Sequence, residues 1–125
     1  MRPVAAEMDP GIWSNALLRD DMTEFIEVLR IEKLPPGRGV CVTVKGQDIA
    51  LFNVDGSIYA IEDSCLHQGS SLAAGLLQGK VVTCRSHGWR YDVTTGNTLH
   101  VPDYGVSTFP VKVVEGRILV GVGEP

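Results

Sequence analysis

The chain has 125 residues, of which 44% are hydrophobic and 21% are charged, a balance typical of one globular domain. Its 11 Lys and Arg against 15 Asp and Glu give a net charge of −4, which argues against partners such as nucleic acid or an anionic membrane surface. Because the sequence shows neither an apolar run of roughly 18 residues nor a secretory signal, we expect a cytoplasmic protein that does not span a membrane.

Residues 1–22 are expected to form an N-terminal arm, separate from a domain over residues 23–125. The arm mixes prolines and Gly11 with an acidic pair, Asp20 and Asp21, and has no sustained hydrophobic period. Disorder and partial packing onto the domain both stay open for this segment.

From about residue 25 onward the pattern is that of short β-strands separated by turns. Valines at alternate positions over residues 40–44 predict a strand with one buried face. Residues 49–54 and 57–61 are predicted to form a hairpin around Asp55 and Gly56, because both positions of its two-residue turn need positive φ.

Four further strands are expected in the second half of the chain, over residues 80–83, 89–93, 106–114 and 117–122. Residues 25–31 fit either a strand or an amphipathic helix by their periodicity alone. Many short strands at this spacing indicate an all-β fold, a small sandwich or barrel.

Two short pairs of cysteine and histidine carry the chemistry that the sequence offers. Cys65 and His67 are separated by one residue, Cys84 and His87 by two, and 16 residues lie between the pairs. Two thiolates and two imidazoles suit iron or zinc. The cysteine and histidine of each pair are too close in sequence to lie on separate elements, so we expect each pair to lie on one loop. Structural zinc sites usually show other spacings, which favours iron, although zinc stays an alternative.

The strings around these pairs resemble the Rieske family signature: Cys-Leu-His-Gln-Gly at 65–69 and Cys-Arg-Ser-His-Gly-Trp-Arg-Tyr-Asp at 84–92. The resemblance covers roughly residues 23–122. It implies the Rieske fold, a small antiparallel β-sandwich with a two-loop cluster-binding subdomain, and a strand over residues 25–29. It also implies a [2Fe–2S] cluster in which Cys65 and Cys84 hold one iron while His67 and His87 hold the other.

Several positions depart from the family pattern. Arg85 stands where many members have proline, either as a solvated side chain or as a charge that tunes the site. Ser70 and Ser86 stand where respiratory and photosynthetic members have two bridging cysteines, which favours the soluble ferredoxin branch and predicts a looser, wetter cluster site. Trp89 replaces a serine of high-potential relatives while Tyr91 is retained, so we expect a low reduction potential, below zero.

The remaining candidates have plainer interpretations. Cys41 lies on a predicted strand and is expected to be a structural or packing thiol, not a ligand. His100 is expected to be a surface histidine. Residues 101–104 correspond to the proline-bearing loop that shields the cluster in the family.

The sequence contains no dinucleotide-binding fingerprint and no second set of metal ligands, so no catalytic residues are predicted. The resemblance implies a soluble one-electron carrier between a flavin-dependent NAD(P)H reductase and a terminal oxygenase. One alternative is a small electron-transfer subunit of a reductase such as nitrite reductase. A zinc-stabilised interaction domain is another.

Overall fold

The computed structural model describes residues 23–66, 69–86 and 88–123, so the predicted N-terminal arm lies outside the described residues. Nearly all regular structure in the described ranges is antiparallel β, and a single 3-10 turn, η2 (Ile31–Lys33), is the only helical element described there. No helix among these residues has the length and apolar character that crossing a bilayer requires.

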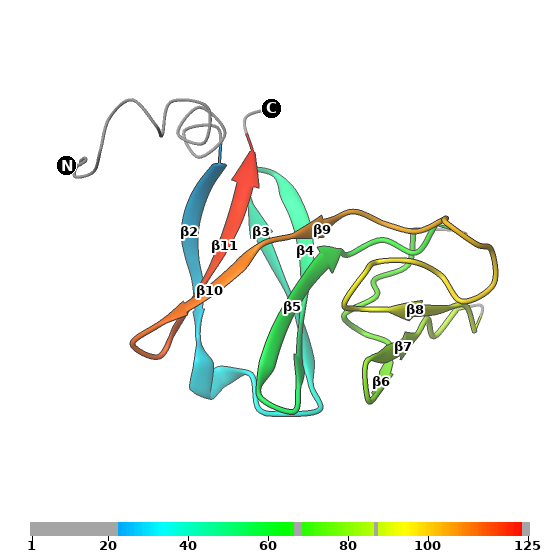
Figure 1. Cartoon of the computed structure of the whole chain (residues 1–125), viewed down its shortest axis with the longest axis horizontal. Helices are drawn as coiled ribbons and strands as arrows, with labels where there is room; N and C mark the ends of the chain where they lie inside the picture. Colours follow the sequence, from blue (N-terminus) through cyan, green and yellow to red (C-terminus); the bar gives the residue numbers. More distant parts are fainter. Residues whose placement is uncertain (1–22, 67–68, 87, 124–125) are drawn as a thin grey trace, which may run out of the picture.

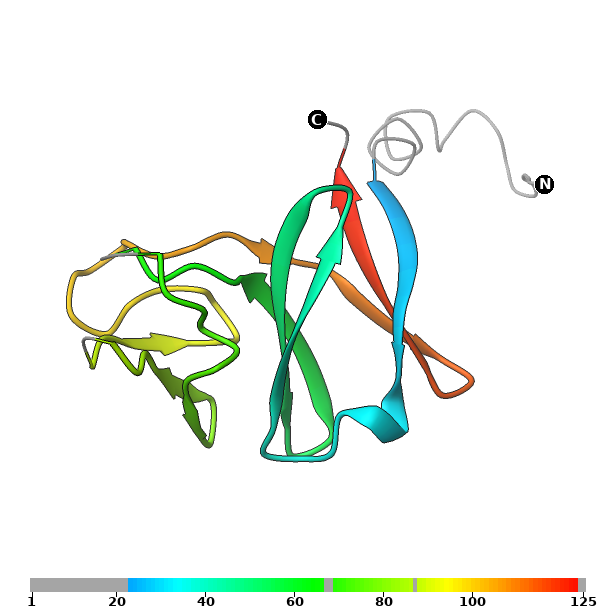
Figure 2. The ribbon, with the colours of Figure 1, turned by 180° about the vertical axis from the view of Figure 1, so that it is seen from behind.

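The strands form three antiparallel sheets. The first sheet has the order β10 (Val111–Val114), β11 (Arg117–Gly123) and β2 (Thr23–Arg30). The second has the order β3 (Gly39–Val44), β4 (Gln47–Val54), β5 (Ser57–Glu62) and β9 (Thr108–Phe109). The third has the order β6 (Leu76–Gln78), β7 (Val81–Thr83) and β8 (Arg90–Asp92). Figures 1 and 2 show the first two sheets together as one body, with the third sheet and its loops as a lobe beside β5. This arrangement confirms the predicted all-β fold with a separate two-loop subdomain.

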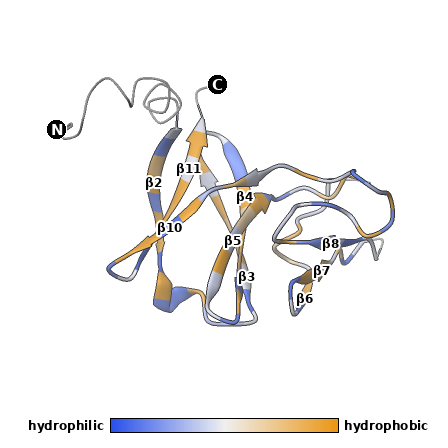
Figure 3. Cartoon of the chain, viewed as in Figure 1, coloured by the Kyte–Doolittle hydropathy of each residue, from blue (hydrophilic) through white to orange (hydrophobic). Residues whose placement is uncertain are grey.

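Strand β4 is central because both of its faces are buried. Ile49 and Leu51 pack with β11 in a core between the first two sheets, whereas Ala50 and Phe52 pack in a second core with Tyr91 of β8. Side chains alternate across a strand, so two apolar partners explain the uninterrupted hydrophobic run of β4. In Figure 3 orange is frequent along β5 and β11, while the turns are blue or pale. The second core therefore joins the lobe to the central sheet.

The hairpin turn predicted at Asp55 and Gly56 adopts the backbone conformation that its sequence requires. In the turn between β4 and β5, Asp55 has φ 53° and Gly56 has φ 97°. The turn between β3 and β4 uses Lys45 and Gly46 in the same way, with φ of 51° and 80°. Positive φ at both central positions is the mark of a type I′ turn, whose twist matches that of the paired strands.

Two expectations about strands are resolved by the pairing. The ambiguous segment after residue 22 is strand β2, which pairs with β11 along its length. The single strand predicted over residues 106–114 is wrong, because Pro110 separates β9 from β10 and the two belong to different sheets. Proline has no N–H to give to a ladder, so a crossing between sheets is a suitable place for it. The short strand β6 was not predicted.

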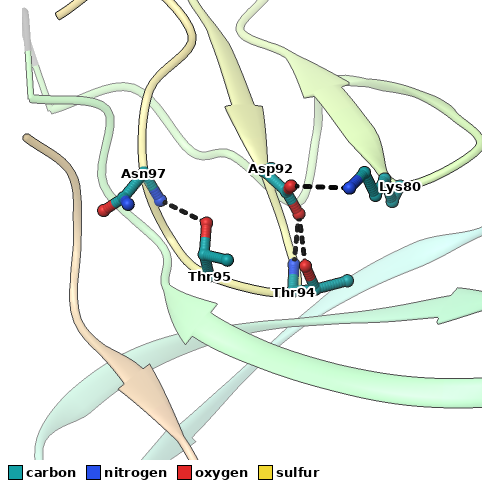
Figure 4. A network of polar contacts seen from close by, with 5 residues as sticks. All are labelled: Lys80, Asp92, Thr94, Thr95 and Asn97. Carbon is teal, nitrogen blue, oxygen red and sulfur yellow. Dashed lines mark hydrogen bonds and ion pairs between the residues drawn. The ribbon is translucent and has the colours of Figure 1, made fainter. Parts of the chain in front are cut away.

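The turn after β8 is organised by Asp92. Its carboxylate accepts hydrogen bonds from the N–H of Thr94 at 2.9 Å and from Thr94 Oγ1 at 2.6 Å, and pairs with Lys80 Nζ at 3.1 Å (Figure 4). Burial disfavours the charged form, but the hydrogen bonds from Thr94 and the ion pair with Lys80 outweigh it and lower the pKa of Asp92. The network fixes the end of β8, the strand that carries Tyr91.

Asp92→Asn is expected to reduce the free energy of unfolding at neutral pH by about 1 kcal/mol, since it removes a charge that accepts two hydrogen bonds. A lowered pKa in the folded state means that this contribution is present above the unfolded carboxyl's pKa, about 3.9, and is lost as pH falls through the folded pKa. Urea unfolding of both proteins at several pH values below about 5 and at neutral pH measures the difference. Asp103→Asn, an exposed turn position, is the control. Equal pH dependence of D92N and the parent protein would contradict the assignment.

Candidate metal centre

The two predicted ligand pairs begin in turns of the same internal design. Gly69 N–H donates to the Cys65 carbonyl at 2.7 Å, and Gly88 N–H donates to the Cys84 carbonyl at 2.9 Å. Each turn is then closed by the N–H of its cysteine, which donates to the carbonyl five residues later, Ser70 at 2.8 Å or Trp89 at 2.7 Å. The first turn follows β5 and the second joins β7 to β8.

Glycine is required at the fourth position after each cysteine. Gly69 has φ 74° and Gly88 has φ 76°, a left-handed conformation that residues with a Cβ seldom adopt. The glycines that trail each Cys–His pair in the sequence therefore have a backbone reason: each lets its N–H reach the carbonyl of the cysteine four residues earlier.

Both cysteine side chains are buried in the second core. Cys65 and Cys84 are each 1% exposed and pack with Leu72, Val82 and Tyr91. Neither cysteine takes part in a disulfide in the part of the chain that the structure describes. Two thiols at the boundary of an apolar core form a soft donor set that excludes water on one side, which suits an iron–sulfur group better than a hard cation.

Tyr91 links the core to the first turn. Its hydroxyl oxygen accepts a hydrogen bond from Leu66 N–H at 2.9 Å, so the hydroxyl hydrogen is available to Cys65 Sγ, 3.4 Å away. Burial, followed by the hydrogen bond with Cys65, raises the pKa of Tyr91 above its usual value near 10. The hydroxyl therefore stays protonated and can act as a donor to sulfur. Tyr91, which the sequence retains from the family pattern, therefore supplies a hydrogen-bond donor at this site.

The two predicted histidine ligands, His67 and His87, lie outside the described residues, and so does Gln68. The described residues thus place the two cysteines of the predicted set and not the two histidines. The buried thiols, the paired turns and the tyrosine donor all fit the group that the sequence predicts.

Cys41 lies on β3, outside the two turns that carry the predicted ligands. It lies on the exposed face of β3, so the packing role expected for it is wrong. Desolvation of its thiol, followed by a hydrogen bond with Asp63, raises the pKa of Cys41 to about 11. Since the thiolate is the metal-binding form, a thiol that remains protonated at neutral pH is a poor ligand.

Ser70 and Ser86 join the two turns directly. Their hydroxyl oxygens lie 2.6 Å apart, the distance of a short hydrogen bond. The Arg85 guanidinium Nε also donates to the carbonyl of Ala74, in the segment that follows the first turn. The two turns are thus joined by a hydrogen bond, so the looser site expected from the replacement of two cysteines by serines is wrong. Arg85 is held by a backbone carbonyl and is not simply solvated.

Asp63 is a functional candidate that sequence reasoning missed. Its buried carboxylate accepts hydrogen bonds from Ser71 Oγ, at 2.8 and 3.0 Å, and from Ala73 N–H at 2.7 Å. These contacts hold the segment after the first turn against the end of β5. An aspartate two residues before a ligand cysteine, with serines beyond it, is a weak signal, because nothing in the sequence shows that the chain folds back on itself there.

His100 is exposed, as expected, but its ring is held in place. Its Nε2 accepts a hydrogen bond from Arg90 N–H at 3.2 Å, and its ring lies 5.5 Å from that of Trp89, centroid to centroid. The following loop is fixed to the same region, since Thr98 N–H donates to the Tyr104 carbonyl at 2.7 Å. Val101 and Tyr104 are largely exposed in this loop.

Comparison with protein families gives a match that spans most of the chain. The model that describes the Rieske [2Fe–2S] domain matches residues 24–110. A curated relative, the ferredoxin component of a naphthalene 1,2-dioxygenase system from Pseudomonas aeruginosa, is 36% identical over 101 residues, which cover 79% of this chain and 97% of the relative.

Solved structures of similar fold include proteins from two kinds of system. A complex of reduced oxygenase and oxidised ferredoxin in carbazole 1,9a-dioxygenase contains a chain that aligns with a TM-score of 0.73 and 31% identity, over 81% of this chain and 95% of that one. A putative NADH-dependent nitrite reductase small subunit from Mycobacterium tuberculosis aligns with a TM-score of 0.76 and 27% identity, over 84% of this chain and all of that one (100%).

Proposed function

We propose that this chain, which belongs to the Rieske [2Fe–2S] domain family, is a one-electron carrier of a multicomponent oxygenase system. The observation that carries the proposal is the pair of equivalent turns, each with a buried cysteine at its start, in a chain whose curated relative is a dioxygenase ferredoxin component. The carrier works with enzymes and is not one by itself.

The ligand set that we propose is Cys65 and Cys84 on one iron with His67 and His87 on the other. A [2Fe–2S] group held this way supplies transfer of a single electron. The protein contributes an apolar wall behind the thiols and, through Tyr91, a hydrogen-bond donor to Cys65.

The partners that we propose are a flavin-dependent NAD(P)H reductase as electron donor and a terminal oxygenase as acceptor, in the cytoplasm. The chain's net charge of −4 allows electrostatic attraction to basic surfaces of such partners. Leu66, next to the proposed ligand His67, is partly exposed and offers an apolar contact beside the proposed site. A carrier has to release each partner quickly, which a small, partly charged contact permits.

The function is tested by electron transfer in a purified system. NADH, a flavin-dependent ferredoxin reductase and cytochrome c are mixed with and without this chain, and reduction of cytochrome c is followed by absorbance. We expect reduction to depend on the chain and to slow as salt rises. The C84S variant is the control for carriage through the proposed site. Absence of chain-dependent reduction, or NADH oxidation by the chain alone, would contradict the function.

The resemblance to a nitrite reductase small subunit supplies a second candidate, which co-purification separates from the first. A carrier should leave its partners during gel filtration at high salt. A subunit should remain with a larger reductase chain under the same conditions.

The reduction potential should lie below zero, and Tyr91→Phe should lower it further. The Tyr91 hydroxyl donates toward Cys65 Sγ, and a donor to sulfur stabilises the more negative, reduced state. A hydrogen bond worth about 1 kcal/mol corresponds to about 40 mV in a one-electron couple. Voltammetry at neutral pH measures both proteins, with Tyr104→Phe, an exposed tyrosine, as the control. A midpoint near +300 mV, or an unchanged potential in Y91F, would contradict this account.

A further inference from the structure

The backbone hydrogen bonds inside each turn fix its cysteine within that turn, but they do not set the distance between the two turns. In the first turn, the bonds join Cys65 to Gly69 and Ser70, and in the second they join Cys84 to Gly88 and Trp89. None of these four bonds crosses from one turn to the other. A site that takes ligands from both turns needs a further element to hold the turns at one separation.

Three sets of side-chain contacts make that crossing in the described structure, and they involve Tyr91, the pair Ser70 and Ser86, and Arg85. On the buried side, Tyr91 reaches from β8 to Cys65 and Leu66. On the outer side, the hydroxyls of Ser70 and Ser86 meet at 2.6 Å. Also on the outer side, Arg85 Nε donates to the carbonyl of Ala74.

The two outer contacts join neighbouring residues of the second turn to the short segment 70–74, which follows the first turn. Arg85 and Ser86 are consecutive in the second turn, and Ser70 and Ala74 belong to the stretch that Asp63 fixes against β5. Asp63 is buried and accepts hydrogen bonds from Ser71 and Ala73, so it fixes the segment to which the outer contacts attach. Two adjacent residues of the second turn, Arg85 and Ser86, therefore bind the segment that Asp63 holds in place.

We propose that Ser70 and Ser86, supported by Arg85, form a non-covalent clamp that sets the distance between the two ligand turns. The clamp rests on the proposed function, since its purpose is to position ligands for one shared group. Ser70 and Ser86 act through the turns that bear the ligands and are positioning residues. Ser86 is exposed, so water competes for this hydrogen bond, and the clamp is weaker and more reversible than a covalent link.

The first test removes each hydroxyl. S70A and S86A are expected to lose iron–sulfur absorbance to a chelator about fivefold faster than the parent protein, and the double variant no faster than either single one, because both changes break the same bond. S70T, which keeps a hydroxyl, should restore the slow rate. Ser57→Ala, an exposed position on β5, is the control.

A spectroscopic readout separates positioning from general stability. The electron paramagnetic resonance spectrum of reduced S70A and S86A should be broadened relative to the parent and S57A, since the ligand turns then sample more than one spacing. Loss rates and spectra that equal the parent's would overturn the clamp while leaving the proposed function intact. A parent protein that binds no iron and sulfide would instead overturn the proposed function, and the clamp with it.

The second test replaces the hydrogen bond by a covalent one. A disulfide requires side chains whose Cβ atoms lie about 3.8 Å apart, which two hydroxyl oxygens at 2.6 Å allow. In the S70C/S86C variant, oxidised glutathione takes two electrons and two protons from the thiols, which gives one protein disulfide and two reduced glutathiones.

We expect mass spectrometry to find this disulfide in S70C/S86C and no intramolecular link in S70C or S86C alone. The oxidised variant should lose its iron–sulfur absorbance more slowly than the parent, and reduction of the disulfide should abolish that gain. A cysteine pair that stays reduced under these conditions would show that the turns are not held together at these residues, and would overturn the proposal.

Discussion

Cys65→Ser and Cys84→Ser are expected to abolish stable binding of iron and labile sulfide, and His67→Ala and His87→Ala to do the same. A missing ligand leaves iron open to water, and the two cysteines are buried where no other thiol among the described residues can replace them. The purified parent protein should contain about two irons and two acid-labile sulfides per chain. Iron and sulfide analysis with the visible absorbance spectrum measures the loss.

Cys41→Ser is the matched control for the cysteine variants. It makes the same chemical change at an exposed thiol on β3, whose pKa is raised to about 11. We expect its iron and sulfide content to equal that of the parent. Loss of iron from C41S, or retention of it in C65S or C84S, would mean that the ligand assignment is wrong. Zinc without labile sulfide in the parent protein would support the zinc-domain alternative.

Gly105→Ala is expected to reduce the free energy of unfolding by about 3 kcal/mol, the upper end of the range for overpacking. A Cβ on Gly105 would collide with the carbonyl oxygen of Gly96 and lie 2.5 Å from the Asn97 Cα. Both neighbours are backbone atoms, which cannot turn aside as a side chain can. The collision would force Gly105 away from residues 96 and 97 and so break the bridge between Asn97 and Gly105 that closes this loop.

Urea unfolding measures this effect, with Gly79→Ala as the control. Gly79 has φ +60° and open space around it, so an added methyl meets only backbone strain, worth about 1 kcal/mol. A larger loss in G79A than in G105A would show that backbone conformation, not the close approach of the two segments, governs this part of the lobe.

Local chemistry made much of the fold predictable. Asp55 and Gly56 are residues that tolerate positive φ, and the structure uses them as the hairpin turn that the sequence predicted. Alternation in residues 40–44 correctly predicted a strand with Val42 and Val44 turned inward. These features depend on the conformations open to a few neighbouring residues, and such information is present in the sequence.

The features that the sequence did not predict depend on contacts between residues that are distant in the chain. Strand β6 has three residues with little apolar pattern and exists because it pairs with β7. The anchoring of Arg85 on Ala74 depends on a fold-back that local pattern does not encode. The hydrogen bond between Ser70 and Ser86 likewise replaced the looser site expected from the loss of two cysteines.

The sequence by itself predicts the proposed donor set of Cys65, His67, Cys84 and His87, because their spacing and the glycines after them are local properties of two short segments. Only the tertiary structure decided that the two thiols share one core. That core forms where β4 turns its second face, with Ala50 and Phe52, toward the third sheet. Burial of both faces of a strand requires two partners that are distant in the chain, and their meeting depends on packing of the whole fold, which no short pattern specifies.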